Sequence, residues 1–206
     1  MSTARQIRFV VLTMSVLALA ASVAFASPSG SSAAASPAAG WIRAGSAPAD
    51  YDMGVDRAVS HGGKGSGFIR SNKPVTGGFG TLMQMFDAEK FHGKRLRLSA
   101  WVKNEGVSSW AGVWMRVDGR GKDMLAFDNM QSRPIKGSAD WKKYEVVLDV
   151  APEATAIAFG ILLDGPGRAW IDDIALEAVD KSVPTTGAIN GAGFSPAPQN
   201  LDFETK

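Results

Sequence analysis

Alternation of apolar and polar residues dominates the middle of the chain. Residues 95–103 place Leu96, Leu98, Ala100 and Val102 on one face, and residues 110–118 repeat the pattern. The period of two recurs in 144–150 and in 156–163, where few polar side chains occur on either face. Because successive side chains of a strand point to opposite faces, these segments are predicted strands, and 156–163 is expected to be central.

The rest of the patterned sequence is also predicted to be β-structure. Glycine, asparagine, aspartate and proline separate the apolar runs, and the one plausible helical turn lies near 87–91. About eight short strands with this spacing favour two packed antiparallel sheets over a parallel sheet with helices. The sequence therefore predicts an all-β sandwich over residues 41–180. Four further strands are expected at 66–71, 79–86, 124–130 and 168–177.

The first 26 residues have the three parts of an export signal. Arg5 and Arg8 supply the positive charge, residues 9–21 an apolar run, and Ala24-Phe25-Ala26 a small-x-small cleavage site. Cleavage after Ala26 predicts a periplasmic or secreted protein with no stable membrane insertion. Retention of this segment as an uncleaved anchor is the alternative.

Two stretches of small residues and proline flank the patterned region. Residues 27–40 are expected to be a flexible leader and residues 181–199 a flexible linker, because neither can bury enough apolar area to offset chain entropy. The chain contains no cysteine, so an exported fold must rely on its packed core.

Charge makes nucleic acid and anionic lipid unattractive partners. The whole chain has 22 basic and 20 acidic residues, a formal charge of +2. Residues 1–26 contain two arginines and no acid, so their removal leaves 20 of each. A neutral protein has no net attraction for polyanions, so neither nucleic acid nor an anionic membrane surface is an expected partner.

Aromatic side chains on polar strand faces are the main candidates for binding. Trp101 and Trp114 lie opposite the aliphatic faces of their predicted strands, and Arg116 follows in the second. An indole ring beside polar groups can stack against a sugar ring while those groups bind the hydroxyls. The alternative is that another segment covers this face. Polar residues inside apolar strands are further candidates for hydroxyl recognition: Gln84, Asp128 and Asn129.

Two adjacent carboxylates interrupt the last predicted strand. The alternation breaks at Asp172 and Asp173, as a β-bulge would require. Either a structural calcium draws on these oxygens, or the segment is a simple surface bulge. His61 and His92 both lie in predicted loops, and no nucleophile or metalloprotease motif is present, so the sequence predicts no enzyme and no required cofactor.

Several segments together resemble a known type of module. GFGTLMQ, RLSAWVK, WAGVWMRVDG, DWKKYEVVLDV and AWIDDIALE are similar to strands of the galactose-binding-domain-like jelly rolls found in bacterial carbohydrate-binding modules. The resemblance covers 41–179. It implies a jelly-roll sandwich, sugar contacts from a concave sheet or loops, and a calcium near the last strand, at Asp172 or Asp173.

The resemblance also bears on the end of the chain. Such modules commonly open with an Asn-x-x-Phe-Glu strand, and here a similar segment stands at 200–204. We expect residues 200–206 to return as an edge strand, with a frayed tail as the alternative.

The expected function is that of an exported non-catalytic binding module for a carbohydrate or cell-envelope glycan. The first alternative is a periplasmic protein-interaction or structural module that docks a partner protein on the same face. A hydrolase with an unrecognised carboxylate pair ranks third.

Overall fold

The computed structural model describes residues 37–74, 78–121 and 123–187. The predicted export signal, most of the leader, most of the linker and the segment 200–206 lie outside these residues. In the described part, no helix is long and apolar enough to cross a membrane. Its helical structure consists of two short 3-10 turns, Pro48–Asp50 and Glu89–Phe91.

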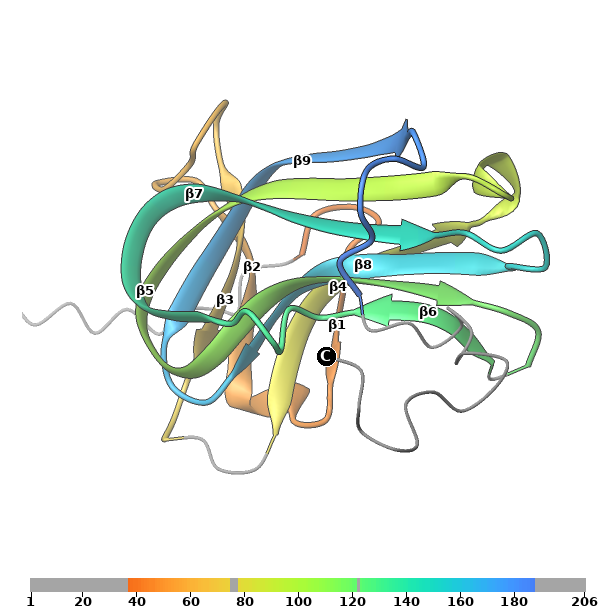
Figure 1. Ribbon diagram of the computed structural model, residues 1–206. Helices are drawn as coiled ribbons and strands as arrows, with labels where there is room; N and C mark the ends of the chain where they lie inside the picture. Colours follow the sequence, from red (N-terminus) through yellow and green to blue (C-terminus); the bar gives the residue numbers. More distant parts are fainter. Residues whose placement is uncertain (1–36, 75–77, 122, 188–206) are drawn as a thin grey trace, which may run out of the picture. The chain divides into compact units, whose positions relative to one another are not determined.

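Nine strands of the described chain form one continuous hydrogen-bonded sheet that folds over into two layers (Figure 1). In chain order they are β1 (Ile42–Gly45), β2 (Tyr51–Asp56), β3 (Ser66–Ser71), β4 (Phe79–Asp87), β5 (Arg95–Asp118), β6 (Met124–Asp128), β7 (Ile135–Asp149), β8 (Ala156–Asp164) and β9 (Arg168–Val179).

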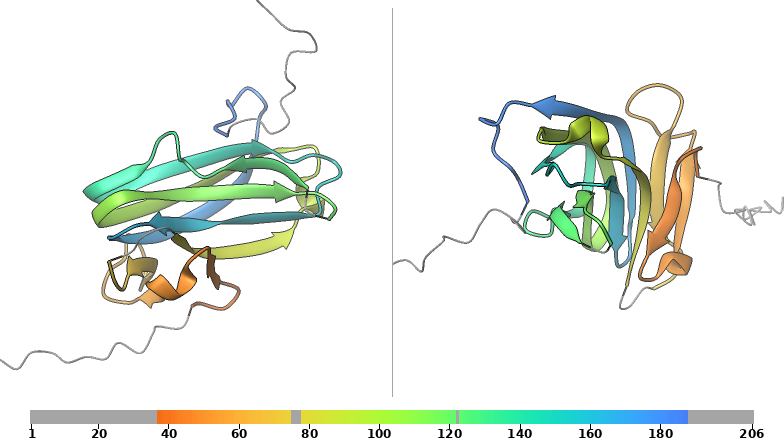
Figure 2. Two further views of the ribbon diagram at one scale, coloured as in Figure 1. Left: turned by 90° about the horizontal axis from the view of Figure 1, so that it is seen from below. Right: turned by 90° about the vertical axis from the view of Figure 1, so that its right-hand side faces the viewer.

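The two layers share the long strand β5. One layer, called the β9 layer, has the order β2-β3-β9-β5-β7, and the other, called the β8 layer, has the order β1-β4-β8-β5-β6. The first half of β5 pairs with β9 through Glu105, and the second half pairs with β8 from Trp110. Figure 1 shows β5 and β7 bending together as they pass between the layers, and Figure 2 shows the strands around their common interior.

The apolar faces of both layers form the core. In the first half of β5 the fully buried side chains have even numbers, as at Leu96 and Val102, and in the second half they have odd numbers, as at Val113 and Val117. The pairing of β5 with β7 is irregular between Val102 and Ala111, which shifts the alternation by one position. Each fully buried aliphatic side chain contributes about 1.5–3 kcal/mol.

This structure confirms the predicted class, an antiparallel all-β sandwich. The strands predicted at 66–71, 79–86 and 156–163 are present, and the turn near 87–91 is the second 3-10 turn. The prediction of separate strands at 95–103 and 110–118 is wrong, because the chain stays hydrogen-bonded through the intervening residues, with bulges. β7 begins earlier than predicted, at Ile135, and β1 and β2 were not predicted at all.

Candidate functional site

The face of the β8 layer that points away from the core, called here the outer β8 face, is unusually apolar. Antiparallel partners share a face, so register identifies its members: Trp110 pairs with Asp164, and Arg116 with Ala158 and Phe127. All the large hydrophobic side chains that are exposed in the described residues lie on this face. They are Ile42, Phe79, Met85 and Met124, between 38% and 51% exposed.

Trp114 occupies the middle of the outer β8 face, but its indole is buried. The residue is 6% exposed, and its Nε1 donates a hydrogen bond to Thr81 Oγ1 at 2.8 Å. Its cross-strand partner on β8 is Gly160, which has no side chain, so the indole reaches across β8 to β4. The prediction that Trp114 stands open on its face is therefore wrong. It packs with Met83, Ala158 and Leu162 as a second apolar cluster.

One end of the outer β8 face carries a hollow of about 450 Å³ between aromatic and polar side chains. Phe79 and the half-buried Trp110 line it together with Asp164 and Ser109. Ser109 Oγ donates to Asp164 Oδ2 at 3.3 Å, so the carboxylate and the hydroxyl lie side by side. The sequence analysis did not select Phe79 or Trp110. Trp110 is four positions before Trp114 in the same strand, so the alternation puts both on one face and could have identified it.

The other end carries a second hollow, of about 580 Å³, around an ion pair. Met85 and Met124 line it with Arg116 and Asp118. Arg116 Nη2 donates to Asp118 Oδ2 at 2.9 Å, and both side chains are partly exposed. Arg116 is therefore on the predicted face, with its guanidinium paired to a carboxylate within the same strand.

Trp101 lies on the outer face of the β9 layer, away from Trp114. The ring of His61 stacks on it with centroids 4.0 Å apart and an angle of 14° between the planes, and Trp141 contacts His61 edge-on at 5.6 Å. Trp101 is consequently half-buried, covered on one side by the loop between β2 and β3. The prediction of one face bearing both tryptophans is wrong, because β5 changes layer and alternation between them.

The predicted bulge at Asp172 and Asp173 is confirmed, and it fastens that loop. Asp173 has a φ of 46°, and the pairing with β5 shifts between Ser99 and Trp101. Asp172 Oδ2 accepts the backbone N–H groups of His61 and Gly62 at 2.8 and 3.1 Å. Asp173 Oδ2 lies 2.6 Å from His61 Nδ1.

This arrangement does not fit a calcium site. Calcium takes six to eight oxygen ligands, whereas the Asp172 oxygens accept backbone N–H groups, including that of Asp173 at 2.9 Å. In the described part of the chain, no three acidic or histidine side chains are placed to hold a metal ion. The partners of the two carboxylates are the backbone N–H groups of His61, Gly62 and Asp173 and the ring of His61.

Asp128, the last residue of β6, has a buried side chain that bonds to the loop that follows. Its side chain is 5% exposed and forms an ion pair with Arg133 at 2.6 Å, and Thr186 Oγ1 donates to it at 2.5 Å. Asn129 accepts the backbone N–H of Gln131 and lines a hollow beside Phe127.

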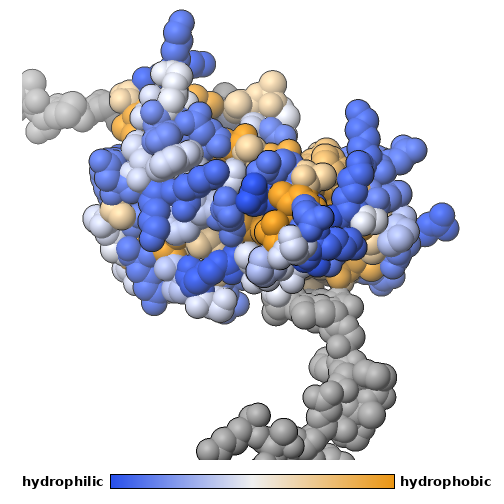
Figure 3. All heavy atoms as spheres, turned by 45° about the horizontal axis from the view of Figure 1, so that its top comes forward, coloured by the Kyte–Doolittle hydropathy of each residue, from blue (hydrophilic) through white to orange (hydrophobic). Residues whose placement is uncertain are grey.

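Gln84 of β4 pairs in register with Phe159 of β8, whose side chain faces the core. The amide group of Gln84 lies near Gly40, close to the start of the described chain. Gln84 and Asp128 therefore do not share a face with Trp101 or Trp114, whereas Asn129 lies two residues after Phe127, whose ring is 6.5 Å from that of Trp114. The surface in Figure 3 likewise shows hydrophobic areas divided by hydrophilic side chains.

The all-β sandwich is similar in fold to solved domains that include a carbohydrate-binding module and a cyclase. A xylan-binding domain, CBM22-1 of Paenibacillus barcinonensis Xyn10C, superposes with a TM-score of 0.50 over 71% of this chain and 90% of that domain, at 12% identity. A cyclase from Fischerella in its apo form gives 0.52 over 70% and 85%, at 17% identity. These likenesses show the fold alone.

One curated protein is similar in sequence. It is an uncharacterised HTH-type transcriptional regulator, YbfP, of Bacillus subtilis (strain 168), 45% identical over 166 residues. The match covers 80% of this chain and 56% of YbfP, so the chain spans about half the length of that relative. No family model matches the chain.

Proposed function

We propose that this domain is a non-catalytic carbohydrate-binding module, periplasmic or secreted, that binds its ligand on the outer β8 face. The observation that carries the proposal is the gathering of exposed hydrophobic side chains on this one face, with charged groups at each end. Sugar recognition needs both kinds of group, since a pyranose ring has apolar C–H faces and a polar rim.

The hollow at Phe79 and Trp110 is the best place for a sugar ring. Trp110 offers a half-buried indole for stacking, and Phe79 is 38% exposed beside it. Asp164 pairs in register with both Phe79 and Trp110 and so lies between them, and Ser109 Oγ donates to it, so a carboxylate and a hydroxyl are available for two neighbouring sugar hydroxyls. Charge-assisted hydrogen bonds of this kind are about twice as strong as neutral ones.

The second hollow favours a ligand with several sugar units. Trp110 and Arg116 are six positions apart on β5, which corresponds to about 20 Å along an extended strand. A ligand that contacts both must extend along β5, and a free monosaccharide does not reach from one to the other. An oligosaccharide or a polysaccharide segment is therefore the ligand class proposed. The xylan-binding domain with the same fold supports this class.

The similarity to YbfP is compatible with a sensing role for this module type. A helix-turn-helix consists of two helices, the second of which enters the major groove, whereas the helical structure in the described residues consists of two three-residue 3-10 turns. We therefore infer that the shared region is the part of the regulator that does not read DNA. In both proteins the proposed task is to bind a ligand, and DNA contact is not proposed for this chain.

Docking of a partner protein is the alternative that the same face favours. Ile42, Met85 and Met124 are aliphatic and exposed, and such side chains bury well against another protein. The two functions differ in which residues matter. Sugar binding depends on Trp110 and Asp164, whereas protein docking depends on the aliphatic side chains.

The test is calorimetric titration of the purified protein with soluble xylan and a panel of other polysaccharides. We expect at least one to bind, and Phe79→Ala and Trp110→Ala to weaken binding tenfold or more. Trp101→Ala, on the other layer, is the matched control and should bind like the wild type. Absence of binding across the panel, or equal loss in Trp101→Ala, would contradict the proposal.

A further inference from the structure

One carboxylate stands in the hollow at Phe79 and Trp110. Asp164, the last residue of β8, pairs in register with Phe79 of β4 and with Trp110 of β5. Antiparallel partners share a face, so Asp164 lies between the two aromatic residues on the outer β8 face. Of the described residues that line the hollow, Asp164 alone carries a charge.

Asp164 has no cationic partner within the described part of the chain, since none of the ion pairs found there includes it. Ser109 Oγ donates to Asp164 Oδ2 at 3.3 Å, which is longer than the usual O–H···O distance of about 2.7 Å. The carboxylate therefore keeps most of its capacity to accept hydrogen bonds from a ligand.

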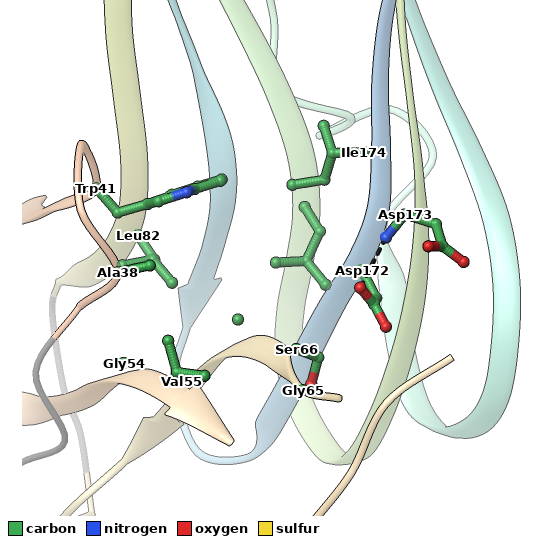
Figure 4. A pocket seen from close by; sticks show the side chains of 12 residues that line it. Ala38, Trp41, Gly54, Val55, Gly65, Ser66, Leu82, Asp172, Asp173 and Ile174 are labelled. Atoms are coloured by element: carbon green, nitrogen blue, oxygen red, sulfur yellow. Dashed lines mark hydrogen bonds between the residues drawn. The ribbon is translucent and has the colours of Figure 1, made fainter. Parts of the chain in front are cut away.

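Carboxylates elsewhere in the fold are engaged by the protein itself. Asp118, at the other end of the outer β8 face, forms an ion pair with Arg116. At the pocket between the two layers, shown in Figure 4, Asp172 and Asp173 lie to one side, and the Asp172 carboxylate accepts the N–H of Asp173 at 2.9 Å. Asp164 differs from these groups because its charge is not offset and stands inside an aromatic hollow.

The two aromatic residues favour a cation beside that carboxylate. Trp110 is half-buried and Phe79 is 38% exposed, so both offer ring surface to a ligand. An aromatic ring has a negative potential over its face, and a cation within about 6 Å of the ring centre is attracted to it. An ammonium group in the hollow therefore gains from the rings and from the carboxylate, whereas a neutral hydroxyl gains only a hydrogen bond.

The groups in the hollow select among ammonium compounds. A quaternary ammonium has no N–H to donate to the carboxylate, and a lysine side chain offers the indole only a narrow methylene chain. An amino group on a pyranose ring meets both requirements, since its N–H groups can donate to Asp164 while the C–H face of the ring stacks on Trp110. Ser109 Oγ is then available for the neighbouring sugar hydroxyl.

We propose that the ligand is a glycan with free amino groups, a polymer that contains amino sugars which are not acetylated. The inference rests on the proposed carbohydrate-binding function and names the ligand class of the same face. The protonated amine of one unit donates to Asp164, and its ring stacks on Trp110. Further units extend along β5 toward Arg116, whose charge is offset by Asp118, so this ion pair does not repel a cationic chain.

The experiment compares a glucosamine tetramer with the N-acetylglucosamine tetramer of the same linkage, in which acetylation removes the charge. Binding to the full chain is measured by calorimetry at mildly acidic pH, where the sugar amines are protonated. We expect the glucosamine tetramer to bind at least about tenfold more tightly. Its affinity should fall when NaCl is raised from about 0.05 M to about 0.5 M, because salt screens the charged contact, and that of the acetylated probe should change little. This comparison uses the wild-type protein and needs no variant to fold.

Three variants locate the contact. Asp164→Asn keeps an acceptor for Ser109 but loses the charge, so it should weaken binding of the glucosamine tetramer about tenfold and abolish its preference over the acetylated probe. Trp110→Ala should weaken binding of both probes, since both stack on the indole. Glu177→Gln removes an exposed carboxylate that pairs with Arg97 on the β9 layer, and it should bind both probes like the wild type. Circular dichroism melts check that each variant is folded.

The outcomes separate this inference from the proposed function. Equal affinity of the wild type for the two probes, or a preference retained in Asp164→Asn, would overturn the inference. An equal loss in Glu177→Gln would also overturn it, because overall charge rather than Asp164 would then be responsible. If neither probe binds but a neutral polysaccharide does, the amino-sugar inference fails and the carbohydrate proposal stands. If no saccharide of either kind binds, both fail.

Discussion

Replacement of Trp114 by alanine should be costly because the indole is an internal part of the β8 layer. The residue is 6% exposed and packs against Met83 and Leu162. Truncation of a buried large aromatic side chain to alanine costs about 3–5 kcal/mol. The hydrogen bond to Thr81 is also lost, but Thr81 Oγ1 still donates to the carbonyl of Ile161 at 2.9 Å. No large further penalty is expected for that hydroxyl.

The expected loss is large enough to measure as a change in melting temperature. For a domain of roughly 140 residues, 1 kcal/mol corresponds to about 3 °C, so Trp114→Ala should lower the melting temperature by about 9–15 °C. Circular dichroism melts and urea unfolding of the same samples give two independent measures. The denaturant slope should stay the same, since the unfolded chain exposes a similar surface.

Trp101→Ala provides the matched comparison. Trp101 is half-buried, and its main packing partner is the stacked ring of His61. Such an aromatic pair contributes about 0.5–1.5 kcal/mol beyond area burial, so the shift should be well below that of Trp114→Ala. Equal shifts in the two variants, or a shift below about 3 °C for Trp114→Ala, would refute the reasoning from burial.

Two further predictions concern ion pairs. Arg133→Ala should lower the free energy of unfolding by about 3 kcal/mol, because the Asp128 carboxylate stays buried without its partner; a loss below about 1 kcal/mol in urea unfolding would contradict this. The hydrogen bond from Arg70 holds the pKa of Asp52 below its usual range, so this pair stabilises the fold above about pH 4 and is lost as the pH falls through the lowered pKa. Asp52→Asn should therefore lose less stability than the wild type between about pH 5 and pH 2, and equal losses would argue against the pair.

The strands that the sequence predicted well are short apolar runs with at least one buried face, and β8 is buried on both faces. β3, β4 and β8 lie where the period of two and the flanking glycines placed them. β1 was missed because it is four residues long and largely exposed, so burial imposes no pattern on it. The boundary of β7 was missed because its first half, before Trp141, carries polar and exposed side chains, where alternation has no meaning.

The candidate site was harder to predict because it depends on contacts distant in sequence. The alternation along the strand predicted correctly that Trp114 lies on the outer β8 face. It could not show that Gly160, which has no side chain, lets the indole lie across β8 and bond to Thr81. Nor could the alternation show that β5 passes from one layer to the other between Trp101 and Trp114, which places the two side chains on different layers. The Asp172-Asp173 bulge was predictable from local sequence, whereas its partner His61 stands more than a hundred positions away.

The position of β9 has a consequence for how the protein reaches its folded state. β9 is the last strand in the described chain, yet it lies between β3 and β5 in its layer. Until residues 168–179 have been synthesised, β3 and β5 have no partner on those edges, and closing that gap requires contacts between distant parts of the chain. Folds with such long-range strand pairing form slowly, and until they form, their unpaired strand edges can pair with other chains. The incomplete polypeptide is therefore the form in which this protein is most vulnerable to aggregation.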